Sequence, residues 1–138
     1  MPCLTRYFIK AGLLYFGGGL ALVFLSNLLA LDEYPWLASA TPVYFHMIMV
    51  GWITQIIMGV SFWMFPALAR DNPRGNERLG WLAWAGINLG MMARMVGEPL
   101  SASGTSVFPG LVLILSALLQ WLGGLAYVVL IWPRVKGK

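Results

Sequence analysis

Charged residues are scarce in this sequence, at 10% of its 138 residues. Soluble domains usually carry about 25% charged residues, so this scarcity argues against a soluble globular protein. Because 59% of the residues are hydrophobic, the chain could not cover its surface with polar groups in water. We therefore expect membrane lipid to surround it. The net charge of +4 does not predict a nucleic-acid partner, because the cations are distributed as in a membrane protein.

Cysteine and histidine each occur once, as Cys3 and His46. A single cysteine excludes an internal disulfide and a cysteine-based zinc site. We expect Cys3 to be an ordinary free thiol, with lipidation near the membrane as the alternative. His46 is the only imidazole that the chain offers to a metal or a proton.

Long apolar segments occupy most of the chain. We expect four membrane-spanning helices, at about 8–31, 43–68, 79–97 and 107–132, because each has the ~20 residues that cross ~30 Å of hydrocarbon. The segments are too long for barrel strands and do not alternate strictly. The first segment is longer than the apolar core of a signal peptide, so we expect it to be retained. The sequence thus predicts an all-α fold, an integral membrane four-helix bundle that forms a single transmembrane domain over residues 1–138.

Eight of the nine cations lie in the loops, in the tails or, for Lys10, near the inner end of the first apolar segment, all on one side of this topology. They are Arg6, Lys10, Arg70, Arg74, Arg78, Arg134, Lys136 and Lys138. The loops around 32–33 and 98–106 contain no lysine or arginine. The positive-inside rule then predicts a multi-pass protein of the cell inner membrane with both termini in the cytoplasm.

The ninth cation, Arg94, lies inside a predicted span, near the outer end of 79–97. A charge within a span costs roughly 2.5–3.5 kcal/mol on insertion scales, so it needs a partner or a wet cavity. Glu98 lies one helical turn further out and can reach it. Arg94 either extends to the outer interface and pairs with Glu98, or offers its planar guanidinium to an anionic group of a ligand.

His46 lies about 5–6 Å inside the start of its span. The spans 43–68 and 79–97 run in opposite directions, so His46, Arg94 and Glu98 are expected at the same depth. A histidine there is either an interfacial, hydrogen-bonded residue or a metal ligand. Haem b would explain the histidine and the arginine together, because haem iron binds imidazole and haem propionates bind arginine. We therefore predict that His46 ligates the metal, that Arg94 binds a propionate and that Glu98 orients Arg94.

Small residues form two strips at spacings of three and four, which favour close helix packing. The strip in 79–97 consists of Ala83, Gly86, Gly90, Ala93 and Gly97. Contact with a flat ring is the alternative role for this strip. The strip in 43–68 consists of Gly51, Gln55 and Gly59, and α-helical winding is expected to turn it well away from His46.

The segment HMIMVGWITQIIMGVSFWMFP, residues 46–66, resembles the second transmembrane segment of haem-copper oxidase subunit I. It is nearest to the nitric oxide reductase branch and the C-type oxidases. The matching features are His46, the pair Gly51-Trp52 and the closing run of residues 63–66, Trp-Met-Phe-Pro. The resemblance covers the first four spans of the family and is specific within the second. It implies that His46 is an axial ligand of a low-spin haem b.

Members of that family take their second haem ligand and the ligands of their binuclear centre from histidines in later spans. This chain has no other histidine, so dioxygen or nitric oxide reduction by the family's mechanism is not expected. The sixth haem ligand would come from His46 of a second copy in a homodimer, which is the commonest oligomer. Met95 of the same chain is the alternative ligand, and an open position that binds a gas is the third arrangement.

The sequence thus predicts a haem b protein with one haem site near the outer face. It would exchange electrons with a quinol or a periplasmic carrier, or sense nitric oxide, carbon monoxide or dioxygen, and it is not expected to be a stand-alone enzyme. The alternative is a haem-free structural or assembly subunit of a respiratory membrane complex. In that case His46 would bond a neighbouring helix, and the pair of Arg94 and Glu98 would help to dock a partner.

Overall fold

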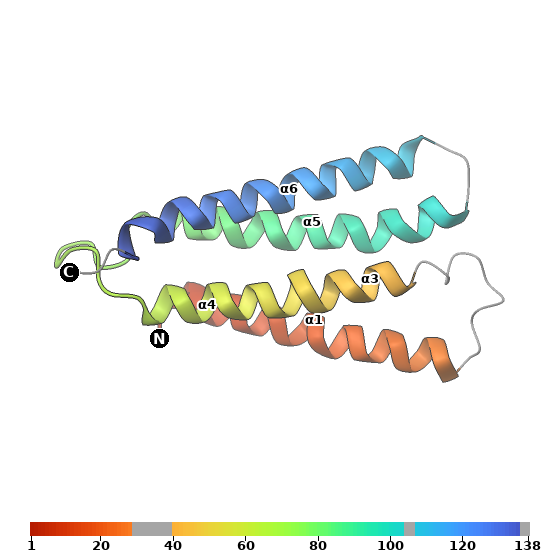
Figure 1. Ribbon diagram of the computed structural model, residues 1–138, viewed down its shortest axis with the longest axis horizontal. Coiled ribbons are helices and arrows are strands. Elements are labelled where there is room, and N and C mark those ends of the chain that lie inside the picture. The colour runs from red at the N-terminus through yellow and green to blue at the C-terminus, as the bar shows by residue number, and fades with distance from the viewer. Residues whose placement is uncertain (29–39, 104–106, 136–138) are drawn as a thin grey trace.

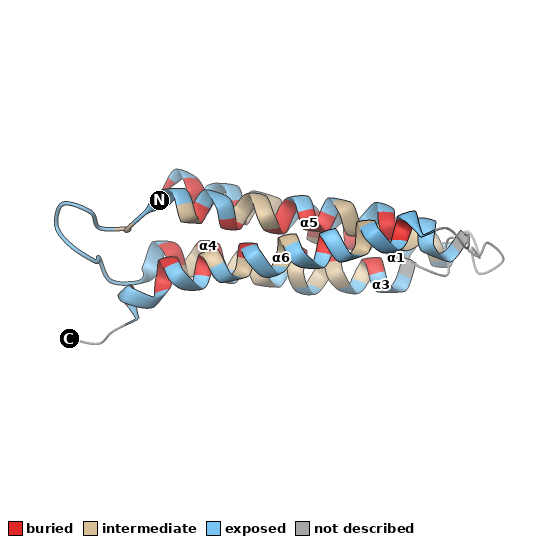
Figure 2. Cartoon of the chain, turned by 90° about the horizontal axis from the view of Figure 1, so that it is seen from above, coloured by how far each residue is buried: buried red, intermediate tan, exposed pale blue. Residues whose placement is uncertain are grey.

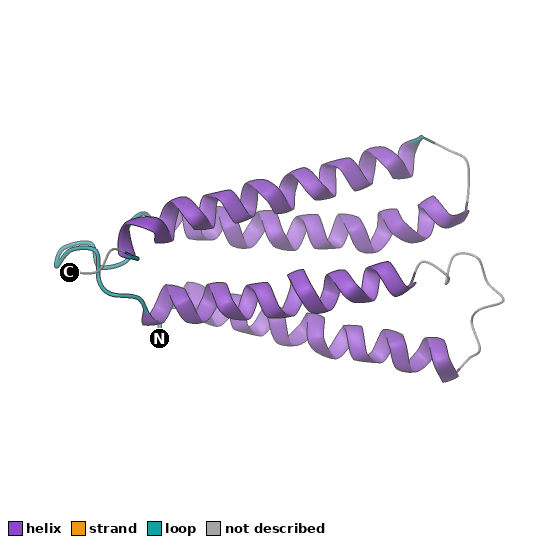
Figure 3. Cartoon of the chain, in the orientation of Figure 1, coloured by secondary structure: helices purple, strands orange, loops and turns teal. Residues whose placement is uncertain are grey.

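The computed structural model describes residues 1–28, 40–103 and 107–135, and within these ranges it contains helices, turns and no strand (Figure 3). The elements α3, η2 and α4 follow one another without a break and form a single rod, so the described residues form four helical rods. The predicted all-α class is confirmed. The elements in chain order are α1 (Cys3–Leu28), α3 (Ala40–His46), the π-helix η2 (Met47–Thr54), α4 (Gln55–Met64), α5 (Glu77–Ser103), α6 (Phe108–Ile131) and the short 3₁₀-helix η3 (Trp132–Arg134).

Three of the four rods are long and apolar enough to cross a membrane. They are Cys3–Leu28, Thr41–Met64 and Phe108–Arg134. Helix α5 has 27 residues but does not belong to this group, because it carries Asn88, Arg94 and Glu98 as well as a charged first turn. The chain is therefore a membrane-embedded helical protein in which one helix is distinctly more polar than the other three.

The helix ends differ from the predicted spans by a few residues. Helix α1 begins at Cys3 rather than near residue 8, because the cations of its first turns lie on its exposed face and do not interrupt it. The second rod ends at Met64, and Phe65 is extended with ψ 149°, as expected for a residue that precedes a proline. Helix α5 continues past residue 97 and includes Pro99.

The four rods are arranged as two antiparallel pairs (Figure 1). In one pair α5 packs along α6, and in the other α1 packs along the rod of α3, η2 and α4. The pairs meet through α5, which contacts α1, α3 and η2, and through Tyr127 of α6, whose hydroxyl donates to the Met58 carbonyl of α4. The N-terminus, the loop between α4 and α5 and the end of α6 lie at one end of the bundle (Figure 1). Buried and exposed positions alternate along every helix, as Figure 2 shows, and many large apolar side chains face outward, as expected when lipid is the solvent.

The small-residue strip of 79–97 packs against α6. A Cβ atom at Gly86 would lie 2.9 Å from the Leu119 carbonyl oxygen, and one at Gly90 would lie 2.9 Å from the Ser116 carbonyl oxygen. On the opposing helix, a Cβ atom at Gly123 would lie 3.0 Å from the Ala83 carbonyl oxygen. These contacts are between backbones, so the strip serves the close helix packing predicted from its spacing.

Arg134 joins the end of α6 to the end of α4. Its Nε and Nη1 atoms donate to the carbonyls of Pro66 and Phe62, each at 3.0 Å, and Nη2 donates to the Phe65 carbonyl at 2.6 Å. The last carbonyls of a helix have no partner within it, so a buried end needs donors from elsewhere. Sequence reasoning uses Arg134 only as one of the cations that set the orientation, whereas its side chain is buried here and caps a neighbouring helix.

Candidate functional site

His46 is the last residue of α3, at the point where α-helical winding passes into the π-helix η2. Segments of π-helix are rare and often lie at functional sites. The Nδ1 atom of His46 is 2.8 Å from the Pro42 carbonyl oxygen. Because a carbonyl can only accept, Nδ1 donates this bond, and in a neutral ring Nε2 is then the nitrogen with the free lone pair. This arrangement, one nitrogen donating to a carbonyl and the other unprotonated, is typical of histidines that bind metals.

Arg94 and Glu98 lie beside His46 on α5. The Arg94 Nη1 atom donates to Glu98 Oε1 at 2.8 Å, and the same oxygen lies 3.7 Å from His46 Nδ1. The structure thus brings together the three residues that were expected at one depth. Arg94 also pairs with Glu98, which both interpretations of Arg94 allow, since Glu98 can orient the guanidinium toward a ligand as well as compensate its charge. The Glu98 side chain is 10% exposed and that of Arg94 is 18% exposed, so the pair is largely buried.

Two atoms of this pair have no hydrogen-bond partner within the described part of the chain. They are Arg94 Nε and Glu98 Oε2, and both are buried. A buried polar atom without a partner costs about 1–3 kcal/mol, and more when it belongs to a charged group. The cluster of His46, Arg94 and Glu98 therefore has one donor and one acceptor left to satisfy.

The surface next to His46 is a small, open groove of about 180 Å³ lined by Phe45, His46, Met49 and Val50. Phe45 and Met49 are each 57% exposed. Ligand pockets usually measure roughly 300–1,000 Å³ and enclose most of the ligand. A single chain can therefore contact one part of a large planar cofactor here, and a second surface would have to cover the rest.

Met95 is not among the residues that line this groove, and its side chain is 37% exposed on α5. Met47 and Met91 belong to the hydrophobic core. The structure therefore does not bring the predicted intrachain methionine ligand into the site of His46, because Met95 follows Arg94 directly and is turned about 100° from it around the helix.

Within residues 1–28, 40–103 and 107–135, no group of three or more histidine, cysteine, aspartate or glutamate side chains could hold a metal ion. A metal bound to His46 would therefore need most of its ligands from a cofactor or from another chain. Haem meets this requirement, because the porphyrin supplies the equatorial ligands and the protein supplies axial ones.

A buried amide pair, Gln55 and Asn88, links α4 to α5 and was not predicted from the sequence. Asn88 Nδ2 donates to Gln55 Oε1 at 3.1 Å, and both side chains also bond carbonyls of their own helices. The depth argument could have found the pair, since Gln55 lies nine residues beyond His46 and Asn88 lies ten residues before Glu98, which meets His46.

The expectation that Gln55 is turned well away from His46 was wrong. Both residues face α5, since His46 approaches Glu98 and Gln55 bonds Asn88. Nine residues of α-helix would place them about half a turn apart. The eight residues of η2 lie between them, and a π-helix turns roughly 80° per residue, which returns Gln55 to the face of His46.

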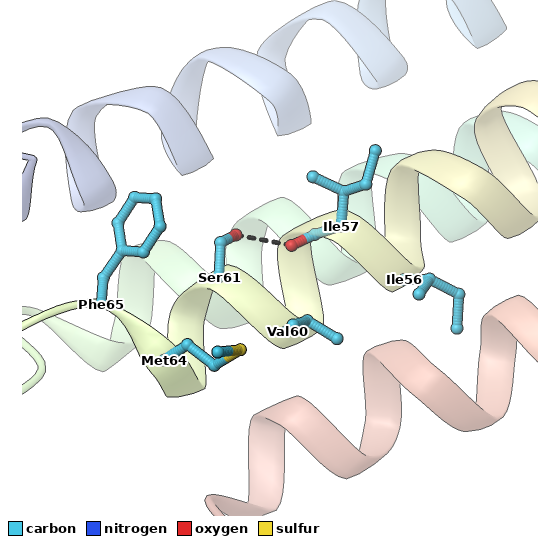
Figure 4. A pocket seen from close by; sticks show the side chains of 6 residues that line it. All are labelled: Ile56, Ile57, Val60, Ser61, Met64 and Phe65. Atoms are coloured by element: carbon cyan, nitrogen blue, oxygen red, sulfur yellow. Dashed lines mark hydrogen bonds between the residues drawn. The ribbon is translucent and has the colours of Figure 1, made fainter.

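A larger open groove of about 480 Å³ lies on α4, at the other end of the rod (Figure 4). Its walls are mostly apolar, and the hydroxyl group of Ser61 donates to the Ile57 carbonyl within the helix. The groove contains no titratable side chain and is not a candidate for chemistry. It is lined by Ile56, Ile57, Val60, Ser61, Met64 and Phe65.

The candidate site is therefore the cluster of His46, Arg94 and Glu98 beside the Phe45–Met49 surface. A scan of protein-family models and searches of curated proteins and solved structures found no match to this chain.

Proposed function

We propose that the chain binds haem b at His46, with the haem held between two copies of the chain near the outer face of the membrane. The observation that carries this proposal is the hydrogen bond from His46 Nδ1 to the Pro42 carbonyl, which directs the lone pair of the ring to Nε2. The small volume of the groove supports a site shared by two chains, because one chain alone leaves a haem largely uncovered.

Arg94 would bind a haem propionate, and Glu98 would orient it. Glu98 already holds Nη1, which keeps the guanidinium in place, while the unpartnered Nε is a donor that an acidic group can satisfy. Bound haem would supply one-electron or gas-binding chemistry, and the apolar bundle and axial ligands would set its potential. We expect the partner to be a quinol, a periplasmic electron carrier or a diatomic gas.

The same proposal includes a four-span topology in which α5 also crosses the membrane. The polar side chains of α5 support this, because Asn88 bonds Gln55 and Arg94 bonds Glu98 inside the bundle. The cations at the end of the bundle that holds the N-terminus favour cytoplasmic termini in an inner membrane. The Arg94–Glu98 cluster would then lie near the outer face.

A second candidate function is that of a haem-free structural or assembly subunit of a respiratory complex. The position of Glu98 favours it, since one carboxylate oxygen lies within 4 Å of both Arg94 and His46 and compensates the charge of Arg94 within the chain. The exposed apolar side chains around Phe45 and Met49 would then contact a partner helix instead of a cofactor.

The absorbance spectrum of the purified protein separates these two functions. We expect a Soret band, sharp bands in the reduced spectrum that indicate a low-spin iron, and one haem per two chains after extraction. One haem per chain would reject the shared site and keep His46 as the ligand. Protein that was produced with ample haem and remains colourless would reject the haem function in favour of the subunit.

Arg94 variants test the propionate contact. Arg94→Lys keeps the charge but loses the planar fork, so we expect weaker haem retention with normal membrane insertion. Arg94→Ala should lose more haem and also stability, because removing one partner of a buried ion pair costs roughly 3–5 kcal/mol. Haem retention during gel filtration and the redox potential are the measurements, with Arg70→Lys in the exposed loop as the control. Unchanged haem content and potential in both Arg94 variants would leave the pair a purely structural role.

A further inference from the structure

The outward face of α1 changes character along its length. Its first ten residues carry Arg6 and Lys10, and the exposed side chains beyond Lys10 are apolar or small as far as Ala21 and Phe24. Spacings of three and four residues place all these positions on one side of the helix. The exposed positions of this face are Cys3, Arg6, Tyr7, Lys10, Leu13, Leu14, Gly17, Leu20, Ala21, Phe24, Leu25 and Leu28.

The charged part of this face is hollowed. Cys3, Arg6, Tyr7 and Lys10 line an open groove of about 340 Å³. Within the described ranges, neither Arg6 nor Lys10 forms an ion pair, since the pairs found there involve His46, Arg74 and Arg94. The two cations therefore make the groove positively charged, and no acidic side chain of the described ranges pairs with either of them.

An aromatic cluster supports one wall of the groove. The ring of Tyr7 packs edge-on against Trp81 and Trp84 of α5, with ring centroids 5.1 Å and 5.7 Å apart. Tyrosine and tryptophan are enriched at the level of the lipid headgroups. The cluster therefore indicates that the groove lies at the membrane interface, and the apolar part of the face then extends into the hydrocarbon.

We infer that this face of α1 binds an anionic phospholipid, with the phosphate between Arg6 and Lys10 and an acyl chain along Leu13, Gly17 and Phe24. The fourteen steps along the helix from Lys10 to Phe24 extend about 21 Å, which is more than one leaflet of hydrocarbon, ~15 Å. A phospholipid matches both parts of the face, whereas an acidic peptide matches only the charged groove. Gly17 leaves open space in the apolar part, because a Cβ atom there would meet nothing within 4 Å.

The single cysteine provides the test, because Cys3 lines the groove and is exposed. The rate at which a soluble maleimide modifies Cys3 is measured in neutral detergent while phosphatidylglycerol is added. We expect phosphatidylglycerol to slow the reaction and phosphatidylcholine to leave it unchanged. Glycerol phosphate, the anionic headgroup without acyl chains, should give no protection at the same concentration. Protection by glycerol phosphate equal to that by the lipid would show a simple anion site and overturn the lipid assignment.

Charge variants show whether the protection is local. In Arg6→Gln/Lys10→Gln the concentration of phosphatidylglycerol that gives half protection should rise about 30-fold, which corresponds to about 1 kcal/mol for each cation. Arg70→Gln/Arg74→Gln removes the same charge from the loop at this end and should keep the wild-type value. Each variant is compared with its own rate without lipid, because nearby cations also change thiol reactivity. A half-protection concentration that rises equally in both double variants would reject a site on α1. So would equal protection by phosphatidylglycerol of the cysteine in Cys3→Ser/Val135→Cys.

Discussion

Replacement of His46 by alanine should remove the haem absorbance and weaken the dimer in the same preparation. The imidazole would supply the bond to iron, and haem that bridges two chains adds its binding free energy to their association. We expect haem content to fall at least tenfold, on the order of the loss seen when the ligand sphere of a metal is disturbed. Pyridine extraction of haem and sedimentation in detergent are the two measurements.

Added imidazole separates loss of a ligand from loss of the fold. Free imidazole can enter the space left in His46→Ala and restore a low-spin spectrum, which a misfolded bundle would not allow. Phe45→Ala is the matched control, because it opens the same groove and keeps the imidazole. Full haem loading of His46→Ala without imidazole would defeat the haem assignment of this site.

Gly123→Ala should lower the thermal stability of the bundle, whereas Gly124→Ala should not. A Cβ atom at Gly123 would lie 3.0 Å from both the Ala83 carbonyl oxygen and the Ile87 amide nitrogen of α5, and backbone atoms cannot rotate away. We expect a cost of about 1–3 kcal/mol, as for overpacked cores. At Gly124 a Cβ atom would meet nothing within 4 Å, and alanine favours a helix by up to about 1 kcal/mol over glycine.

The two variants differ by one residue position on the same helix, so intrinsic helix propensity is matched between them. Unfolding followed by circular dichroism in a mild detergent gives the midpoints. Equal midpoints for Gly123→Ala and Gly124→Ala would show that α5 and α6 separate easily, contrary to the backbone contacts of Gly86 and Gly90.

The helical class and the approximate extent of each helix could be predicted, because both depend on apolar segments long enough to cross a bilayer. The depth of His46, Arg94 and Glu98 was also predictable, since it follows from the rise per residue in two antiparallel helices. The burial of Arg134 was not, because it requires knowing that the end of α6 meets the end of α4. We also considered Met95 as a candidate ligand from the sequence. Which face of α5 meets α3 depends on the packing of the two helices, so the sequence could not decide whether Met95 faces His46.

The winding of η2 was the largest departure from sequence reasoning. Every estimate of which residues share a face assumed 3.6 residues per turn throughout the second rod. Nothing in the composition of residues 47–54 indicates a π-helix. Two interactions accompany the π-helix. Tyr15 of α1 packs closely against Gly51, and the Thr54 hydroxyl donates to the Met49 carbonyl at 2.7 Å.

The π-helix η2 determines how α3 and α4, the two halves of the second rod, are rotated relative to each other. Helix α4 is held to α5 by the bond between the amides of Gln55 and Asn88. Helix α3 ends at His46, whose imidazole lies beside Glu98. If residues 47–54 changed from a π-helix to an α-helix while α4 stayed fixed, His46 would rotate by about half a turn around the rod axis. The imidazole would then face away from Glu98, because α3 would turn about its own axis while α4 stays in place, so a change of pitch alone would engage or release the proposed ligand of His46.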